Sequence, residues 1–276
     1  MKEIPPLNAA AILKQHGLRA DKKLGQNFLQ DPFALEAIIA AAEIHPSDTV
    51  LEIGPGLGSL TRYLAVAARR VVAVELDVDL IPPLEAVTKP YDNIHIVHGD
   101  ILKMPPNELV NEAGYLVVAN IPYYITSAII RHLLENEPKP RRIVLTVQKE
   151  VAERICAEPG DMSLLALSVQ VYGKPRVEKR IPAGAFFPPP KVDSAILSID
   201  IHPSPKIQIE LLDTFFKLIK AGFSQKRKTL RNSLSSGLHI PAAQAEDLLK
   251  EAGIDPMRRA ETLSIEEWNT LGILYK

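Results

Sequence analysis

The stretch that decides the fold is Val50-Leu51-Glu52-Ile53-Gly54-Pro55-Gly56-Leu57-Gly58. It begins with a short apolar run of strand-forming residues and ends in three glycines at alternate positions. Apolar residues at helical spacing follow, at Leu60, Tyr63, Leu64 and Ala67. A strand, a glycine turn and a helix in this order are typical of an open α/β sheet, which binds ligands at the carboxyl ends of its strands. Glycine permits both the sharp turn and the close approach of a ligand.

The spacing of these glycines argues against a dinucleotide site. Gly54, Gly56 and Gly58 give Gly-x-Gly-x-Gly, whereas the dinucleotide fingerprint is Gly-x-Gly-x-x-Gly. Glu52, just before the turn, would also repel a pyrophosphate. A cofactor with a positive charge and no phosphate suits the turn better. S-adenosylmethionine is such a cofactor, and a nicotinamide dehydrogenase is the disfavoured alternative.

Strands and helices alternate on both sides of this turn. Before it, helices are predicted over 7–16 and from Pro32 to about Ala42. After it, strands are predicted at 71–74, 94–97, 116–119 and 143–147, with helices at 80–87, 127–134 and 150–157. This alternation predicts a doubly wound parallel sheet covered on both faces. Two later strands are predicted near 176–181 and 195–201, the second as a candidate antiparallel edge strand.

Each early strand is followed by a polar side chain at its carboxyl end. After Glu52 these are Glu75, Asp100 and Asn120, and strand ends of a doubly wound sheet line one crevice. Glu75 lies about twenty residues past the glycine turn, where an acidic side chain can accept both ribose hydroxyls of a nucleoside. Asp100 is placed to accept from an adenine amino group. We therefore expect a nucleoside-containing cofactor in this crevice.

Asn120-Ile121-Pro122-Tyr123 carries the most specific chemistry. An exocyclic amino group on adenine is a poor nucleophile because its lone pair is delocalised into the ring. The side-chain oxygen of Asn120 and the backbone carbonyl of Ile121 can both accept hydrogens from it, which frees the lone pair. Pro122 fixes the turn, and Tyr123 can stack on the base. The alternative is an Asn-x-Pro turn with a core tyrosine.

Composition limits the class of protein. The chain has 276 residues, 46% of them hydrophobic, with a net charge of −1, so binding of a polyanion must come from local clustering. Cys156 is the only cysteine, which excludes an intramolecular disulfide. The chain contains no apolar run long enough for a membrane span and begins without a signal core, so we expect a soluble cytoplasmic protein. No histidines stand at metal-ligand spacing, and we predict no metal.

The pattern becomes purely helical after a Pro-rich linker at 202–205. We expect a first domain over 1–202, with an N-terminal arm, and a helical domain over 206–276. Its helices are predicted at about 209–221, 226–235, 242–252 and 264–273. This second domain contains a cluster of cations at Lys226, Arg227, Lys228 and Arg231, which can hold RNA phosphates. A solvated charged face is the alternative.

At these motifs the chain resembles the rRNA adenine N6-dimethyltransferase family, most closely its bacterial small-subunit (16S) branch. The resemblance runs from about Lys22 to Trp268. Its marks are Leu-Gly-Gln-Asn-Phe-Leu at 24–29, Glu-Ile-Gly-Pro-Gly at 52–56, Val-Glu at 74–75, Gly-Asp at 99–100, Asn-Ile-Pro-Tyr-Tyr at 120–124, the stretch from Phe186 to Ser194, and the basic segment near 226–234.

The resemblance implies a class I (Rossmann-like) S-adenosylmethionine-dependent methyltransferase sheet with a small all-helical C-terminal domain. It implies N6,N6-dimethylation of two adjacent adenosines in the 3′-terminal hairpin loop of 16S rRNA. The partner would be a small-subunit ribosomal particle, and we expect a monomer with no membrane contact. The implied cofactor-binding residues are Asn27, Leu29, Gly54, Gly56, Glu75, Asp100, Ile101 and Asn120. The implied catalytic residues are Asn120, Pro122, Tyr123 and Phe186, the last as a second wall for the flipped adenine.

Two alternatives remain open within this reading. Large-subunit rRNA dimethylases share these motifs, although the Phe-Phe-Pro-Pro-Pro loop at 186–190 and the stretch Gln225 to Arg231 favour the small-subunit type. The second alternative is a ribosome-assembly factor whose methylation is secondary. The arm from Arg19 to Gln30 has its own two interpretations, a lid over the site or a simple N-terminal strap.

Overall fold

The structure, a computed structural model, describes residues 4–275, and its contacts divide the chain into two compact units. The first unit runs up to Ala152 and includes Pro175–Ile201. The second consists of Glu153–Lys174 and the chain from His202 onward. We expected 153–174 in the first domain, but these residues pack with the C-terminal helices. The chain therefore enters the helical unit twice.

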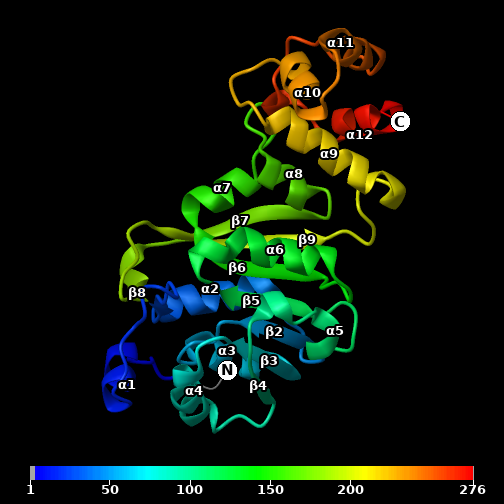
Figure 1. Ribbon diagram of the computed structural model, residues 1–276. Helices are drawn as coiled ribbons and strands as arrows, with labels where there is room; N and C mark the ends of the chain where they lie inside the picture. Colours follow the sequence, from blue (N-terminus) through cyan, green and yellow to red (C-terminus); the bar gives the residue numbers. More distant parts are fainter. Residues whose placement is uncertain (1–3, 276) are drawn as a thin grey trace. The chain divides into compact units, whose positions relative to one another are not determined.

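Within the described residues, the first unit is built on a seven-stranded mixed sheet with the order β4-β3-β2-β5-β6-β9-β7 (Figure 1). The strands are β2 (Thr49–Ile53), β3 (Arg70–Glu75), β4 (Ile94–His98), β5 (Leu116–Asn120), β6 (Arg142–Gln148), β7 (Gly173–Ile181) and β9 (Ser194–Ile201). The pairs β2–β3, β3–β4, β2–β5 and β5–β6 are parallel, as the alternation predicted. The carboxyl ends of β2, β3, β4, β5 and β6 therefore meet at one edge of the sheet.

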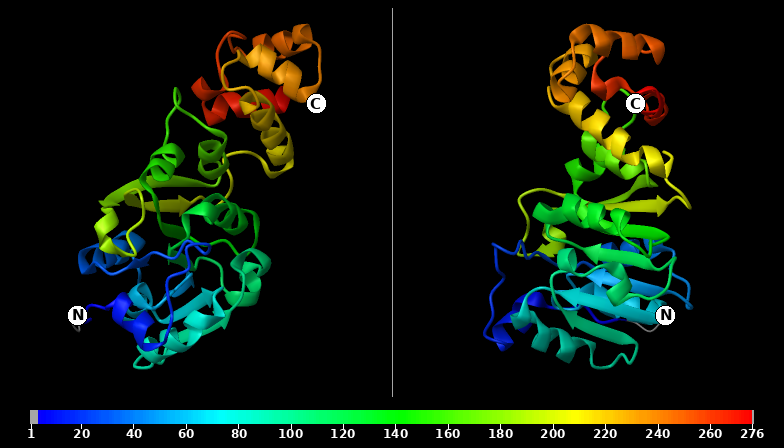
Figure 2. Two further views of the ribbon diagram at one scale, coloured as in Figure 1. Left: turned by 60° about the vertical axis from the view of Figure 1, so that its left-hand side comes forward. Right: turned by 45° about the vertical axis from the view of Figure 1, so that its right-hand side comes forward.

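Helices cover both faces of this sheet, which Figure 2 shows from two further sides. The helices of this unit are α1 (Ala9–Gln15), α2 (Pro32–Ala42), α3 (Ser59–Ala67), α4 (Ile81–Thr88), α5 (Pro106–Leu109) and α6 (Thr126–Glu135), with α7 (Lys149–Ile155) at the boundary. Val117 and Val118 point to opposite faces of β5, and both are fully buried. Ile38 of α2 packs in one core with Val118.

The predicted start of α2 is confirmed. The side chain of Asp31 accepts from the backbone N–H of Phe33 at 3.0 Å, and Pro32 occupies the first helical position. An N-cap carboxylate satisfies a donor that the helix leaves without a partner, and proline lacks the N–H that would need one.

One strand prediction is wrong in position. β9 pairs with β6 in the antiparallel direction, as expected, but it lies inside the sheet, and β7 forms the edge. The burial explains the order: Ser194 to Ile199 are all buried, whereas β7 is exposed over Glu178 to Arg180. A charged strand is suited to an edge, and a strand buried on both faces is not.

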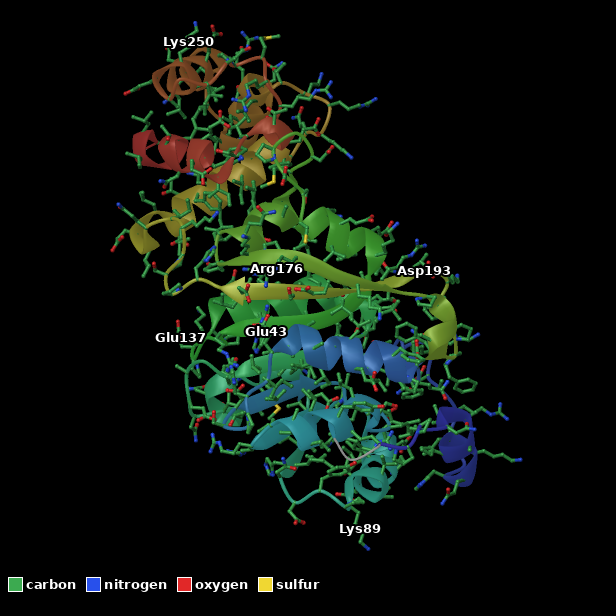
Figure 3. The ribbon with its side chains drawn as sticks, turned by 180° about the vertical axis from the view of Figure 1, so that it is seen from behind. Glu43, Lys89, Glu137, Arg176, Asp193 and Lys250 are labelled. Atoms are coloured by element: carbon green, nitrogen blue, oxygen red, sulfur yellow. The ribbon has the colours of Figure 1, made fainter. Side chains whose placement is uncertain are left out.

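Ion pairs join the elements at the amino end of β6. Arg142 is buried and pairs with Glu43 at 2.6 Å and with Asp200 at 3.0 Å. Arg176 of β7 also pairs with Asp200, at 2.8 Å. Figure 3 labels Glu43 and Arg176 at this end of the strands and Asp193 at the other end. The ion pairs therefore stabilise the sheet at the end opposite the carboxyl ends of β2, β3, β4, β5 and β6.

The helical unit has its own core around Trp268, which is fully buried. Its helices are α8 (Leu164–Gln170), α9 (Leu212–Phe223), α10 (Leu230–Leu238), α11 (Ala242–Glu251) and α12 (Ile265–Leu274). The prediction of a helix from 226 is wrong at its start, because α10 begins at Leu230. Lys226, Arg227 and Lys228 lie on the exposed turn before it. α12 begins with a capping box between Ser264 and Glu267.

Candidate active site

A pocket opens at the carboxyl ends of the parallel strands in the first unit. Five segments line it. They are residues 24–29, residues 52–60 except Gly58, the four residues Val74, Glu75, Leu76 and Leu80, residues 99–101, and residues 120–125. All the predicted cofactor-binding residues lie on its wall, as do Pro122 and Tyr123. Phe186 is not among the lining residues. The described lining residues include no lysine or arginine, so the pocket offers no side-chain cation to a phosphate.

The glycine turn forms a wall made of backbone. Gly54, Gly56 and Gly58 all have positive φ values, 66°, 59° and 83°, which L-residues with a side chain rarely adopt. A Cβ on Gly56 would also lie 3.1 Å from the ring of Phe28. The turn therefore favours glycine at all three positions, and the packing of the arm adds a second requirement at Gly56.

Glu75 closes the turn from the next strand. Its Oε2 accepts from the backbone N–H of Gly56 at 2.9 Å, and its Oε1 accepts from that of Asp77 at 2.9 Å. Burial raises the pKa of this carboxyl, and the two N–H donors oppose that rise. A carboxylate has about four lone-pair sites, so two remain for hydroxyl donors of a ligand.

Glu52 is a second carboxyl in the pocket wall, 1% exposed. None of the described residues donates a hydrogen bond to its Oε2. Burial raises its pKa to about 8, with a further contribution from the charge of Glu75. The hydroxyl of Ser59, also in the wall and buried, has no partner within the described residues. A buried carboxyl and a buried hydroxyl of this kind suit the donors of a cationic amino group.

Asp100 and Ile101 form the wall beyond β4. The Oδ1 of Asp100 accepts from the backbone N–H of Leu102 at 3.1 Å, and its Oδ2 lies 3.5 Å from the ammonium of Lys103. These contacts fix the carboxylate at the rim of the pocket and leave it acceptor capacity. Ile101 is buried and gives the wall an apolar surface there.

The orientation of the Asn120 amide is set by the N-terminal arm. Its Nδ2 donates to the backbone carbonyl of Asn27 at 3.0 Å. The Oδ1 is therefore the remaining polar atom of this side chain in the pocket wall. Neither this oxygen nor the carbonyl of Ile121 accepts a hydrogen bond from any of the described residues. The residues at the end of β5 thus carry two acceptors without a donor among the described residues.

The arm is fixed on both sides of the pocket. Besides its contact with Asn120, it is held by Gln26, whose Nε2 donates to Asp77 at 2.6 Å. Gly25 lies against Tyr124, because a Cβ there would be 3.3 Å from its ring. Leu29 is buried and pairs with Phe186 in a two-stranded sheet of β1 (Phe28–Leu29) and β8 (Phe186–Phe187). These contacts hold residues 24–29 in the wall of the pocket.

The two aromatic residues expected around a base have different positions. Tyr123 is half-buried in the pocket wall, and its hydroxyl lies 2.5 Å from the Oγ of Ser194. Phe186 is 3% exposed and lies in the hydrophobic core with Ala185 and Leu29. Its ring therefore supports the arm through Leu29, and the structure does not place it in the pocket wall.

Sequence reasoning missed some of the lining residues. Leu24, Gly25 and Tyr124 were quoted only as part of motifs, and Ser59 was not singled out. The position of Ser59, at the first residue of the helix after the glycine turn, was the available signal. Within residues 4–275, no group of three or more His, Cys, Asp or Glu residues could hold a metal ion. None of the described helices meets the length and hydropathy needed to cross a membrane.

The family comparison decides how this pocket is interpreted. Residues 17–276 match the model of a family described as ribosomal RNA adenine dimethylase. The chain belongs to this family. A relative from Dehalococcoides mccartyi, named ribosomal RNA small subunit methyltransferase A, is 48% identical over 98% of this chain and 94% of its own length. One of the same name from Alkaliphilus metalliredigens is 40% identical over 98% of this chain and 96% of its own.

Two solved structures of rRNA or adenosine methyltransferases are also similar to this chain. A dimethyladenosine transferase from Plasmodium falciparum is 29% identical with a TM-score of 0.76, over 88% of this chain and 95% of that one. The 23S rRNA methyltransferase ErmE is 29% identical with a TM-score of 0.72, over 90% of this chain and 99% of that one. The sheet is that of a class I S-adenosylmethionine-dependent methyltransferase, and the predicted fold class is confirmed.

Proposed function

We propose that this enzyme transfers methyl groups from S-adenosylmethionine to the N6 nitrogens of two adjacent adenosines in the 3′-terminal hairpin loop of 16S rRNA. The substrate is a small-subunit ribosomal particle, and we infer that the protein acts on it as a monomer in the cytoplasm. The observation that carries the proposal is the amide of Asn120. Its nitrogen is held by Asn27, so its oxygen and the carbonyl of Ile121 present two acceptors to one exocyclic amino group.

The pocket chemistry fits the cofactor. S-adenosylmethionine supplies an electrophilic methyl group on a sulfonium centre. Glu75 accepts from ribose hydroxyls, Asp100 accepts from the adenine amino group, and Ile101 contacts the adenine face. The glycine turn lets the backbone approach the methionine moiety, and Glu52 with Ser59 provides buried polar atoms for its charged end. Asn27 and Leu29 of the arm cover the site.

The target base is oriented by residues that follow β5. Two hydrogen bonds to Asn120 and Ile121 turn the N6 lone pair out of conjugation with the ring. Tyr123 stacks on the base, and Pro122 fixes the turn that presents both groups. Catalysis then comes mostly from holding the reacting atoms in line. A strong general base is unnecessary, since the nitrogen becomes acidic only after it has gained the methyl group.

The helical unit supplies cations for RNA. Lys226, Arg227 and Lys228 are exposed on the turn before α10, and none has an ion pair with the described residues. Arg231, which we expected in the same cluster, is paired with Glu246 at 3.0 Å. Three unpaired cations on one short turn can follow the phosphates of an RNA strand.

The test uses small-subunit particles that lack the modification. The wild-type protein is expected to give dimethyladenosine at both adjacent positions, detected by mass spectrometry of the rRNA. The Asn120→Ala variant is expected to lose transfer by at least about a hundredfold while it still binds the particle. Asn232→Ala, at an exposed amide on α10, is the matched control and keeps full activity. If Asn120→Ala transfers normally, the proposed role of the amide is wrong.

The similarity to the 23S rRNA methyltransferase ErmE supports a second candidate substrate, large-subunit rRNA. The higher identity to relatives named for the small subunit favours the first. Methylation of isolated large-subunit RNA in place of small-subunit particles would reverse this choice. A third candidate, an assembly factor with secondary methylation, predicts that Asn120→Ala supports particle maturation in cells as well as the wild-type protein does.

A further inference from the structure

The hydroxyl of Tyr123 makes one specific contact outside the pocket. It lies 2.5 Å from the Oγ of Ser194, a residue that is fully buried at the start of β9. Its neighbour Tyr124 is 62% exposed, and no hydrogen bond of its hydroxyl is found with the described residues. Of the two adjacent tyrosines, the one assigned to the base is therefore the one that is anchored.

Ser194 is itself held in a fixed place. In the register of the sheet it stands opposite Gln148, the last residue of β6, so Tyr123 reaches from the end of β5 past β6 to β9. The residue before it, Asp193, which Figure 3 labels, accepts from the backbone N–H of Ala183 at 3.0 Å and pairs with Arg180 at 2.5 Å. Its carbonyl also accepts from the N–H of Lys149 at 3.1 Å. Ser194 therefore offers a rigid acceptor or donor to the phenol.

Such an anchor has a definite physical effect on an aromatic ring. The second side-chain torsion of tyrosine is broad, so its rotamer alone does not fix the plane of the ring. A hydrogen bond at the far end of the ring, to a rigid strand, restricts that plane. Because a stacked base lies parallel to the ring, the anchor also sets the plane in which the amino group of the base lies.

We propose that Ser194 is a positioning residue, which holds the Tyr123 ring at the angle needed to present the target adenine for methyl transfer. This inference rests on the proposed function, because it needs a base on Tyr123. It assigns a role to the last residue of the Phe186–Ser194 motif. It also separates the two ends of that motif: Phe186 supports the arm, and Ser194 orients the base.

The test is a double-mutant cycle on single-turnover methyl transfer at saturating cofactor, with unmodified small-subunit particles. Ser194→Ala is expected to slow transfer about fivefold, the effect of one lost hydrogen bond. Tyr123→Phe is expected to slow it by a similar factor. If Ser194 affects transfer only through its contact with the Tyr123 hydroxyl, the double variant is no slower than Tyr123→Phe alone. The dissociation constant for S-adenosylmethionine is expected to stay unchanged in all three.

Ser198→Ala is the matched control. Ser198 lies on the same strand and is also fully buried, and its hydroxyl donates to Glu178 at 2.5 Å, away from the pocket wall. The Ser198→Ala variant should transfer methyl groups at the wild-type rate. This should hold even if thermal unfolding shows that it loses as much stability as Ser194→Ala. An equal slowing in Ser198→Ala, or a full further slowing when Ser194→Ala is added to Tyr123→Phe, overturns the inference.

Failure of the proposed function would look different. Tyr123→Ala removes the stacking surface and is expected to slow transfer far more than Tyr123→Phe. If Tyr123→Ala transfers at the wild-type rate, the base does not lie on this ring, and the proposed function loses its stacking residue. If Tyr123→Ala is slow while Ser194→Ala is unaffected, the proposed function stands and the positioning role is wrong.

Discussion

At the scale of single residues, Glu52 combines full burial with a place in the pocket wall. Its pKa of about 8 means that the carboxyl is mostly neutral at pH 7. An arriving positive charge favours the ionised form and lowers that pKa, so the carboxyl releases a proton when the cofactor binds. Above pH 8 the carboxyl is already ionised, and no such release occurs.

We therefore predict that cofactor binding at pH 7 releases about one more proton in the wild-type protein than in Glu52→Gln. Titration calorimetry in two buffers of different ionisation enthalpy measures this difference. The affinity of the wild-type protein relative to Glu52→Gln should also rise from pH 6 to about 8 and then level off. The comparison cancels the titration of the cofactor's own amino group. Equal proton release by both proteins would show that Glu52 does not meet the charge.

Gly56 is a second residue whose replacement has a defined outcome. An alanine there is strained by its φ of 59°, and its Cβ meets the Phe28 ring at 3.1 Å. We predict that Gly56→Ala lowers the free energy of unfolding by about 1–2 kcal/mol and weakens cofactor binding about tenfold. Gly114→Ala is the control, because its φ is 76° and nothing lies within 4 Å of the new Cβ. It should lose similar stability in denaturant titrations and keep the affinity for the cofactor.

At the scale of elements, the N-terminal arm is held by the pairing of β1 with β8 and by a few side-chain contacts. The longest-range side-chain contacts join Gln26 to Asp77 and Asn27 to Asn120. Such contacts can break and reform without unfolding the sheet. We expect cofactor and product to pass the arm, so its opening should limit how fast they leave.

We predict that Gln26→Ala increases hydrogen exchange of the backbone amides over residues 22–29 and raises the dissociation rate of the cofactor about fivefold. The reason is that the Nε2 bond to Asp77 is lost. Lys22→Ala, at an exposed side chain of the same arm, is the control. An arm that exchanges at the wild-type rate in Gln26→Ala would mean that other contacts hold it closed.

Local signals allowed most elements to be predicted. Asp31 and Pro32 mark the start of a helix because the first caps it and the second suits its first position. The run at 50–53 indicates a strand because of its own apolar composition. The position of β9 inside the sheet could not be predicted in this way, because it depends on pairing with β6, some fifty residues earlier in the chain. The helix expected from 226 begins later because Lys226–Lys228 form a turn whose N–H at Lys228 bonds the carbonyl of Gln225.

The site was predictable to the same degree. The predicted residues at strand ends lie together in the pocket wall because parallel strands bring their carboxyl ends together. The orientation of the Asn120 amide was not predictable, since a backbone carbonyl 93 residues away sets it. Nor was the burial of Phe186, because its core neighbours come from the arm and from β7. Sequence patterns report periodicity and local chemistry, and contacts between distant segments lie outside them.

At the scale of the whole molecule, the two units carry different tasks in our proposal. The pocket and its lining residues belong to the first unit, and the exposed cations Lys226, Arg227 and Lys228 belong to the second. Changes in one unit should therefore affect one step and leave the other unaltered.

We predict that replacing these three cations by alanine weakens particle binding and reduces the steepness of its salt dependence by about 2 logarithmic units per unit of log salt. The affinity for S-adenosylmethionine, measured by calorimetry, should not change. Arg231→Ala is the control, because its guanidinium is paired with Glu246 and is expected to contribute little to the salt slope. An unchanged slope in the triple variant would place the RNA contacts elsewhere.

The double entry of the chain into the helical unit constrains any exchange of parts between relatives. Met162, Leu167 and Val171 belong to the first entry, yet they share one core with Phe215 and Trp268 from the second. Consider a hybrid that takes residues up to 201 from one enzyme and the chain from residue 202 onward from another. Its segment 153–174 would come from the first parent and would have to pack against C-terminal helices of the second. Recombination that preserves folding must transplant both pieces together, so the small unit is inherited as a discontinuous module.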